Sequence, residues 1–100
     1  MKAPHVHVFG RSFYGKRIAM RIDVHFLGLF RTLAGVEREV LDVAEGTTID
    51  RLSNILVQKY QNLPLESENT YFVINDQVSI RNQVLAKGDQ VRIFQLLAGG

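Results

Sequence analysis

The last two residues, Gly99 and Gly100, are the clearest candidates for chemistry in this sequence. Glycine has no side chain and the widest range of backbone angles, so a terminal glycine pair fits a channel too narrow for a Cβ atom. It brings a carboxylate to the far end of that channel. A carboxylate is a poor electrophile, but an acyl-adenylate made from it with ATP reacts with sulfur or nitrogen nucleophiles. We therefore expect a reactive tail in which the Gly100 carboxylate is the reacting group.

The other polar residues do not form a catalytic set or a metal site. The sequence lacks the motifs G-x-x-x-x-G-K-S/T, G-x-G-x-x-G and H-E-x-x-H, and it has no cysteine. His25 is the single histidine of residues 20–100, at an outward strand position where we expect it to be solvated. The carboxylate pairs Glu37/Glu39 and Glu66/Glu68 are expected on solvated surfaces. We expect no catalytic centre of the chain's own and no bound metal.

Length and composition favour one small domain. The chain has 100 residues, 46% hydrophobic and 22% charged, which is ordinary for a globular domain. No apolar run is long enough for a transmembrane helix. The net charge of +2 combines two unlike parts. Residues 1–19 contain four basic residues and no acidic one (+4), and residues 20–100 contain eight basic and ten acidic residues (−2).

This asymmetry predicts the organisation of the chain. We expect residues 1–19 to be a basic N-terminal extension outside the core fold, and residues 20–100 to form the folded domain. A mildly acidic body lacks the basic face that nucleic acid requires, so nucleic acid is not expected as a partner. A membrane is not expected either, because the apolar runs are short.

Alternating polar and apolar residues predict the strands. In residues 21–26 the side chains of Ile22, Val24 and Phe26 recur at every second position, which is typical of a strand with one buried face. The later strands are predicted over residues 37–43, 71–74 and 90–94, with a short strand and a loop over 78–85.

Two segments have helical spacing. The main helix begins near Thr47, a good N-cap with Asp50 three residues later in a capping-box arrangement, and Pro64 prevents its continuation. Its apolar residues form one stripe: Ile49, Leu52, Ile55, Leu56 and Tyr60. Such a helix must bury this stripe, so we expect it to lie on the sheet. A short helix is predicted over residues 29–34, ended by Gly35.

The order of these elements predicts an α+β fold. A mixed β-sheet with one main helix packed on one face, and with the first and last strands central and parallel, is a ubiquitin-like β-grasp. The strand order is a hypothesis about topology, because the residue pattern alone does not specify which strands are neighbours.

The last strand leads into an apolar terminus. Val91 and Ile93 share one face and Arg92, Phe94 and Leu96 share the other; arginine prefers water, so the second face should point outward. Phe94 and Leu96 are then exposed beside two further apolar residues, Leu97 and Ala98. Exposed apolar residues at a terminus favour a partner surface. The alternative is that the terminus folds back onto the domain or frays.

Residues 20–100 resemble the small subunit of molybdopterin synthase, a ubiquitin-like sulfur carrier of the MoaD/ThiS family. The resemblance covers the whole body and excludes the first 19 residues. The segments on which it depends are Phe30–Gly35 after the first strand, Val73–Asn75, Leu85–Val91, Phe94 and Ala98-Gly99-Gly100.

The resemblance implies a carrier that is not itself an enzyme and binds no cofactor. An E1-like adenylyltransferase would use ATP to adenylate Gly100, which then becomes a thiocarboxylate. The tail would enter the active site of the molybdopterin synthase large subunit, where catalysis occurs, and give sulfur to cyclic pyranopterin monophosphate to build molybdopterin. The two subunits would form a heterotetramer in the cytoplasm. Phe94 matches a phenylalanine of the subunit interface and Leu27 matches another hydrophobic interface position.

One departure from the family leaves alternatives open. Many members have two prolines shortly before the terminal glycines, where this chain has Gln95-Leu96. The pathway can therefore differ: a sulfur carrier for thiamin, tungsten cofactor or tRNA thiolation, or a ubiquitin-like modifier attached to lysines through Gly100. In a further alternative the domain is a β-grasp interaction module whose Gly-Gly is incidental.

Overall fold

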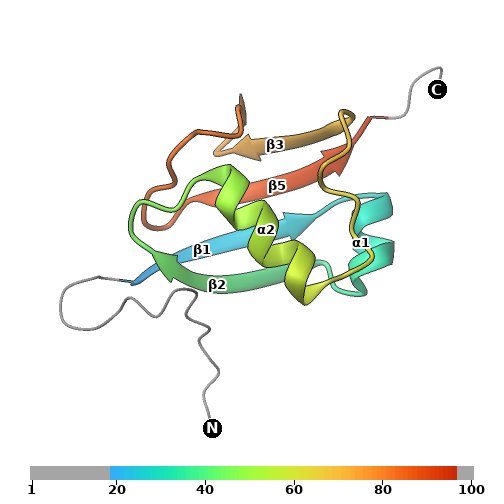
Figure 1. Ribbon diagram of the computed structural model, residues 1–100, viewed down its shortest axis with the longest axis horizontal. Coiled ribbons are helices and arrows are strands. Elements are labelled where there is room, and N and C mark those ends of the chain that lie inside the picture. Colours follow the sequence, from blue (N-terminus) through green and yellow to red (C-terminus); the bar gives the residue numbers. More distant parts are fainter. Residues whose placement is uncertain (1–18, 97–100) are drawn as a thin grey trace, which may run out of the picture.

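A computed structural model describes residues 19–96 of the chain. They form a five-stranded sheet with the long helix α2 across one face, while the short helix α1 lies at one end of the sheet (Figure 1). The elements in chain order are β1 (Ala19–Phe26), α1 (Leu29–Ala34), β2 (Arg38–Ala44), α2 (Ile49–Lys59), β3 (Thr70–Ile74), β4 (Gln77–Ser79) and β5 (Gln90–Gln95). The expected extension, residues 1–19, lies outside the described residues except for Ala19, where β1 begins.

The strand order is β2-β1-β5-β3-β4. The first and last strands, β1 and β5, are neighbours at the centre and run parallel, with Phe26 opposite Ile93 in the register. All other neighbouring pairs are antiparallel. The predicted α+β fold, a ubiquitin-like β-grasp with a mixed sheet, is confirmed.

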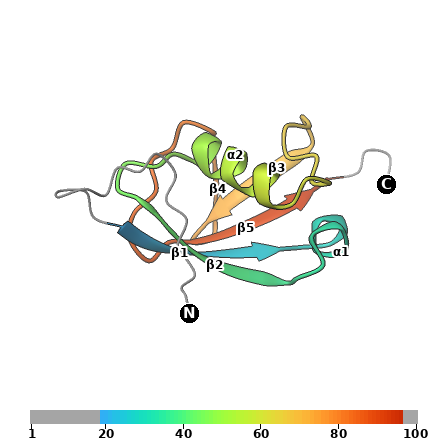
Figure 2. The same ribbon diagram turned by 60° about the horizontal axis from the view of Figure 1, so that its bottom comes forward.

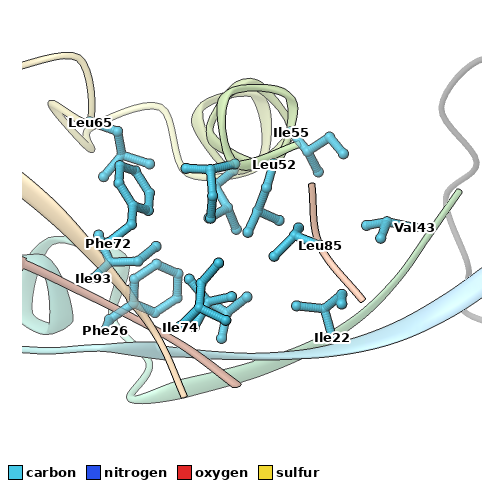
Figure 3. Packing of buried hydrophobic residues seen from close by; sticks show 14 of the residues in the cluster. Ile22, Phe26, Val43, Leu52, Ile55, Leu65, Phe72, Ile74, Leu85 and Ile93 are labelled. Atoms are coloured by element: carbon cyan, nitrogen blue, oxygen red, sulfur yellow. The ribbon is translucent and has the colours of Figure 1, made fainter. Parts of the chain in front are cut away.

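The hydrophobic core lies between α2 and the sheet. Along β1 every second side chain is buried, so Ile22, Val24 and Phe26 face the helix as the alternation predicts. Leu52 of α2 and Phe72 of β3 pack in the same core, and Leu52 lies on the helix side of Ile22 and Phe26 (Figure 3). The opposite face of the sheet has no helix over it in the described part of the chain (Figure 2).

The cap of α2 is one residue later than predicted. Thr48, in an extended conformation, accepts a hydrogen bond from the Arg51 backbone N–H at 3.1 Å. Thr47 belongs to the preceding turn instead, because its hydroxyl donates to the Ala44 carbonyl at 2.6 Å and its own carbonyl accepts from the Leu85 N–H. Two adjacent threonines suit either position, and only these loop contacts distinguish them.

The apolar stripe of α2 is confirmed. Its buried residues are Ile49, Leu52, Ser53, Ile55 and Leu56. Tyr60 is partly buried at the end of the stripe, and its ring meets Phe26 edge-on with 5.5 Å between centroids.

Helix α1 is bounded by two glycines with positive φ. Gly28 (φ 58°) turns the chain out of β1. Gly35 ends the helix as predicted, and it does so in the left-handed conformation (φ 78°). Phe30 is the fully buried residue of α1 and fixes it to the end of the sheet. Within residues 19–96, neither helix has the length and apolar character needed to cross a membrane.

Candidate functional site

The uncovered face of the sheet presents an aromatic pair near the end of β5. Phe94 and Tyr71 are opposite each other in the β3–β5 register, and their rings stack with centroids 5.7 Å apart and planes 20° from parallel. Leu27 follows β1 next to β5, where its N–H donates to the Ile93 carbonyl at 3.0 Å. The structure therefore brings together Leu27 and Phe94, two residues that the sequence places 67 positions apart.

Apolar side chains continue from this pair across the sheet. The β3–β4 register ends with Phe72 opposite Ser79, and Ile80 follows this pair on the side of Tyr71. Leu27 is 38% exposed and Ile80 is 67% exposed. We call these four residues the apolar row: Leu27, Phe94, Tyr71 and Ile80. Tyr71 and Ile80 were not predicted as site residues, because the strand register brings them to the row and no local pattern of the sequence specifies that register.

The charged residues of the same face neutralise one another. The pairs join neighbouring strands, or a strand and a turn: Arg21–Asp42 at 3.1 Å, Arg38–Asp23 at 2.7 Å and Arg92–Asp76 at 2.7 Å. Paired surface charges gain little from a new partner, whereas exposed apolar area gains from being covered. The apolar row is consequently the part of this face best suited to bind another protein.

His25 is more enclosed than the sequence suggested. Its side chain is 27% exposed, and Nε2 lies 3.3 Å from Oδ1 of Asp23 and 3.5 Å from Nε2 of Gln90. Arg38 donates two hydrogen bonds to the Asp23 carboxylate, at 2.7 and 3.2 Å. The three strands β2, β1 and β5 thus meet in a polar cluster that holds the face together next to the apolar row.

These contacts predict how stability depends on pH. The Arg38 hydrogen bonds lower the pKa of Asp23 below its ordinary value of 3.8, and burial opposes them only in part. A lowered folded-state pKa stabilises the protein above the unfolded-state pKa, and this contribution disappears as the pH falls through the folded value. Asp23→Asn should therefore lower the free energy of unfolding at pH 6, and its difference from the wild type should shrink below pH 3.8. Urea titrations at several pH values would show this; a pH-independent difference would contradict it.

The four glutamates of the predicted carboxylate pairs differ in exposure. Glu37, Glu66 and Glu68 are exposed, as expected. The expectation for Glu39 was wrong, because its side chain is only 14% exposed and accepts hydrogen bonds from Lys59 and the Tyr60 hydroxyl. Burial and the Glu39 carboxylate together raise the pKa of Tyr60. Among residues 19–96 no three histidine or acidic side chains gather in a way that suits a metal ion.

A polar link fixes the start of β5. Asn75 is in the left-handed region (φ 50°) and donates from Nδ2 to the Asp89 carboxylate at 2.9 Å. Its Oδ1 accepts from the Gln90 N–H at 3.1 Å, and the other oxygen of Asp89 accepts from the Ala86 N–H at 2.8 Å. Two of the family-like segments, Val73–Asn75 and Leu85–Val91, therefore meet here. The link sets the position of β5, and with it that of Phe94.

One backbone contact lies just past the end of β5. Leu96 is 53% exposed, and its N–H donates to the Asn69 carbonyl at 3.0 Å. The remaining predicted site residues, Leu97, Ala98, Gly99 and Gly100, lie outside the described residues. The structure thus places three of the predicted site residues, Leu27, Phe94 and Leu96, at the end of the sheet where the parallel strands β1 and β5 end.

The sequence matches one family model and one curated relative. The model of the ThiS family matches residues 24–100. The molybdopterin synthase sulfur carrier subunit of Mycobacterium tuberculosis is 28% identical over 82 residues, which is 81% of this chain and 99% of that protein.

Solved structures share the fold at low sequence identity. The small archaeal modifier protein SAMP1 from Haloferax volcanii has a TM-score of 0.72 at 17% identity, covering 80% of this chain and 99% of that one. A chain of the complex of subunits 1 and 2 of the molybdopterin-converting factor from Helicobacter pylori has a TM-score of 0.56 at 21% identity. It covers 81% of this chain and 100% of that one.

Proposed function

The chain belongs to the ThiS family, and from this we propose that it is a ubiquitin-like sulfur carrier whose Gly100 becomes a thiocarboxylate. The observation that best supports the proposal is the extent of the family match. It runs from β1 through β5 to Gly100, and so includes both the apolar row and the Gly-Gly tail. In this proposal the apolar row is the docking surface at the end of β5, and the tail carries the reacting group.

The proposed chemistry has two balanced steps. An E1-like adenylyltransferase joins the Gly100 carboxylate to the α-phosphate of ATP, forming an acyl-adenylate and releasing pyrophosphate. Hydrogen sulfide then attacks the acyl carbon, the bond from this carbon to the AMP oxygen breaks, and AMP and a proton leave. The products are a thiocarboxylate on Gly100 and AMP, with no change in oxidation state at the carbon.

The proposed recipient of the sulfur is the precursor of molybdopterin. The curated relative is named as the sulfur carrier subunit of molybdopterin synthase, and the Helicobacter pylori structure is titled as a complex of two subunits. By analogy, this chain would be the small subunit in a heterotetramer, and the large subunit would supply the catalytic residues. No cofactor is required on the small subunit, because its reactive group is its own C-terminus.

The mass of the intact protein tests the carrier function. The full chain is incubated with ATP, sulfide and a cognate E1-like adenylyltransferase whose ATP–pyrophosphate exchange activity has been verified. We expect a shift equal to the replacement of one oxygen by one sulfur. An unchanged mass with a demonstrably active enzyme would contradict the proposal and favour an interaction module.

Phe94→Ala should weaken binding to the molybdopterin synthase large subunit. The ring is partly exposed in the apolar row and stacks on Tyr71, so a partner that covers it gains a large apolar anchor. The expected loss is about 1–3 kcal/mol, as for a buried interface residue. Titration calorimetry with the purified large subunit would measure it.

Val40→Ala provides the matched control for Phe94→Ala. Val40 is on the same face and is 46% exposed, but it lies on β2 opposite Asp23, away from the row. Its removal should leave the affinity unchanged. Equal affinities for Phe94→Ala and wild type, with both proteins folded, would exclude Phe94 from the interface.

The shared fold supports a second candidate function. SAMP1 of Haloferax volcanii is titled as a modifier protein, and a modifier would use the same activated Gly100 to form an amide with a lysine. The fate of the activated Gly100 distinguishes the two chemistries. With the large subunit and the molybdopterin precursor, loss of the sulfur and return of Gly100 to a carboxylate as molybdopterin forms would support the first function. An isopeptide bond between Gly100 and a lysine would support the second.

A further inference from the structure

The backbone hydrogen bonds that join β5 to its two neighbours, β1 and β3, end at different residues. On the β1 side the last backbone hydrogen bond is the one from Leu27 N–H to the Ile93 carbonyl, because Gly28 then turns the chain away. On the β3 side the contact continues past the end of the strand, to the Leu96 N–H and the Asn69 carbonyl. Beyond Phe94 the chain is therefore held from one side alone within the described residues.

The acceptor on that side is part of a loop with its own internal bonds. The Asn69 N–H donates to the Ser67 hydroxyl at 3.1 Å, and the Ser67 N–H donates to the Pro64 carbonyl at 3.2 Å. Leu65 is fully buried in the core, and Arg81 donates to its carbonyl. These contacts fix the Asn69 carbonyl relative to the sheet. The acceptor of the Leu96 N–H therefore has a fixed position.

The Leu96 side chain contributes little to this attachment. It is 53% exposed, and the hydrogen bond of this residue to the fold comes from its backbone N–H. A proline at this position lacks the N–H and leaves the extended backbone possible. An alanine loses the same side chain but keeps the N–H. Proline would also fix its own φ and restrict the backbone of Gln95, so the hydrogen bond is better tested at its acceptor.

We propose that the hydrogen bond from Leu96 N–H to the Asn69 carbonyl is the fixed end of the reactive tail, and that it makes Leu96 a positioning residue for Gly100. Four residues follow Leu96, and an extended chain advances by at most about 3.6 Å per residue. The acyl carbon of Gly100 then reaches no more than about 14 Å from Leu96. The tail consequently fits a partner whose reactive centre lies at the end of a channel of about that depth, measured from the docked face.

This positioning affects the reaction more than the binding. If the bond is lost, the last residue fixed to the sheet lies earlier in the chain, and the tail that follows it is one or two residues longer. The end of a longer tether spends less time at any one point, and its effective concentration falls roughly as the −3/2 power of its length. Poor alignment of the reacting atoms adds to the loss. We expect the rate of the bound complex to fall on the order of threefold to tenfold, the range that corresponds to one ordinary hydrogen bond.

Hydrogen exchange tests the bond itself. In the full chain the Leu96 amide should exchange more slowly than an unstructured amide, and Leu96→Ala should retain this protection at the same position. Ser67→Ala removes the acceptor of the Asn69 N–H without changing the tail, and it should reduce the protection of the Leu96 amide. Exchange at the unstructured rate in the wild type would overturn the proposal, whatever the function of the chain.

Kinetics test the positioning, which rests on the proposed carrier function. Adenylation of Gly100 is followed with the E1-like enzyme and ATP while the carrier concentration is varied. Ser67→Ala removes a contact that holds the acceptor of the Leu96 N–H and does not change the tail, so kcat should fall while KM stays close to the wild-type value. Val40→Ala on β2 is the control and should change neither constant. An unchanged kcat for Ser67→Ala would overturn the proposal. No adenylation of the wild type by an active enzyme would instead contradict the carrier function, and the exchange data would still decide whether the bond exists.

Discussion

Deletion of Gly100 is expected to abolish formation of the thiocarboxylate and to leave the fold unchanged. The deletion moves the terminal carboxylate back by about 3.5 Å along an extended tail. A displacement of this size in a reacting group costs at least about a hundredfold in rate, because even 1 Å can have such an effect. The domain should stay folded, because the described contacts of the core and the sheet end at Leu96. Intact mass after incubation with ATP, sulfide and the activating enzyme measures the first effect, and urea denaturation measures the second.

Two matched variants distinguish the effect of the length of the tail from the effect of its width. One extra alanine after Gly100 keeps a carboxylate but places it too far along the tail, and this variant should also be inactive. Gly99→Ala keeps the length and adds one Cβ atom, so its activity reports how narrow the receiving channel is. Thiocarboxylate formation at the wild-type rate in the variant without Gly100 would show that the reactive group is elsewhere.

Phe26→Ala should cause the largest loss of stability among substitutions near the apolar row. Phe26 directly precedes Leu27, but its ring points to the opposite face, where it is fully buried against α2 and meets Tyr60 edge-on. Truncating a buried phenylalanine costs about 3–5 kcal/mol, because transfer energy is lost and a cavity remains. Small domains are stable by only about 5–15 kcal/mol. Urea denaturation followed by circular dichroism would measure the change.

Phe26→Leu is the control, because it preserves most of the side-chain volume. Its cost should stay below about 1.5 kcal/mol. Phe94→Ala should destabilise far less than Phe26→Ala, since the Phe94 ring is on the uncovered face. If Phe26→Ala changed the free energy of unfolding by less than about 1 kcal/mol, the assignment of Phe26 to the core would be wrong.

The sequence predicted the elements that depend on local periodicity. The alternation of Ile22, Val24 and Phe26 correctly predicts which face of β1 is buried, and the stripe on α2 correctly predicts the helix. The cap was misplaced from Thr48 to Thr47 because both residues suit it and only their loop contacts distinguish them. The short strand expected within residues 78–85 is β4, which begins one residue earlier at Gln77 and ends at Ser79, where no periodic pattern marks its end.

The candidate site was predicted in part, for the same physical reason. Leu27 and Phe94 were found through the family resemblance, but Tyr71 lies within a continuous apolar run that does not show which side chains face outward. The strand register with Phe94 resolves this. The bond between Asn75 and Asp89 was missed although both segments were noted, because a contact between residues 14 positions apart depends on the tertiary fold. Leu96 was recognised for its side chain, whereas its backbone N–H makes the contact with Asn69.

The central position of β5 has a consequence for how the chain acquires its structure. Until β5 is in place, the β1–β2 hairpin and the β3–β4 hairpin are not connected to each other through the sheet, since β5 alone lies between them. Its pairing with β1 closes a loop of more than sixty residues, from Val24 to Val91, and loops of such length slow folding. A chain still being synthesised cannot complete this sheet before its last strand emerges. We therefore expect folding to occur late and as a single event, so that an incomplete chain does not present the docking surface to an activating enzyme.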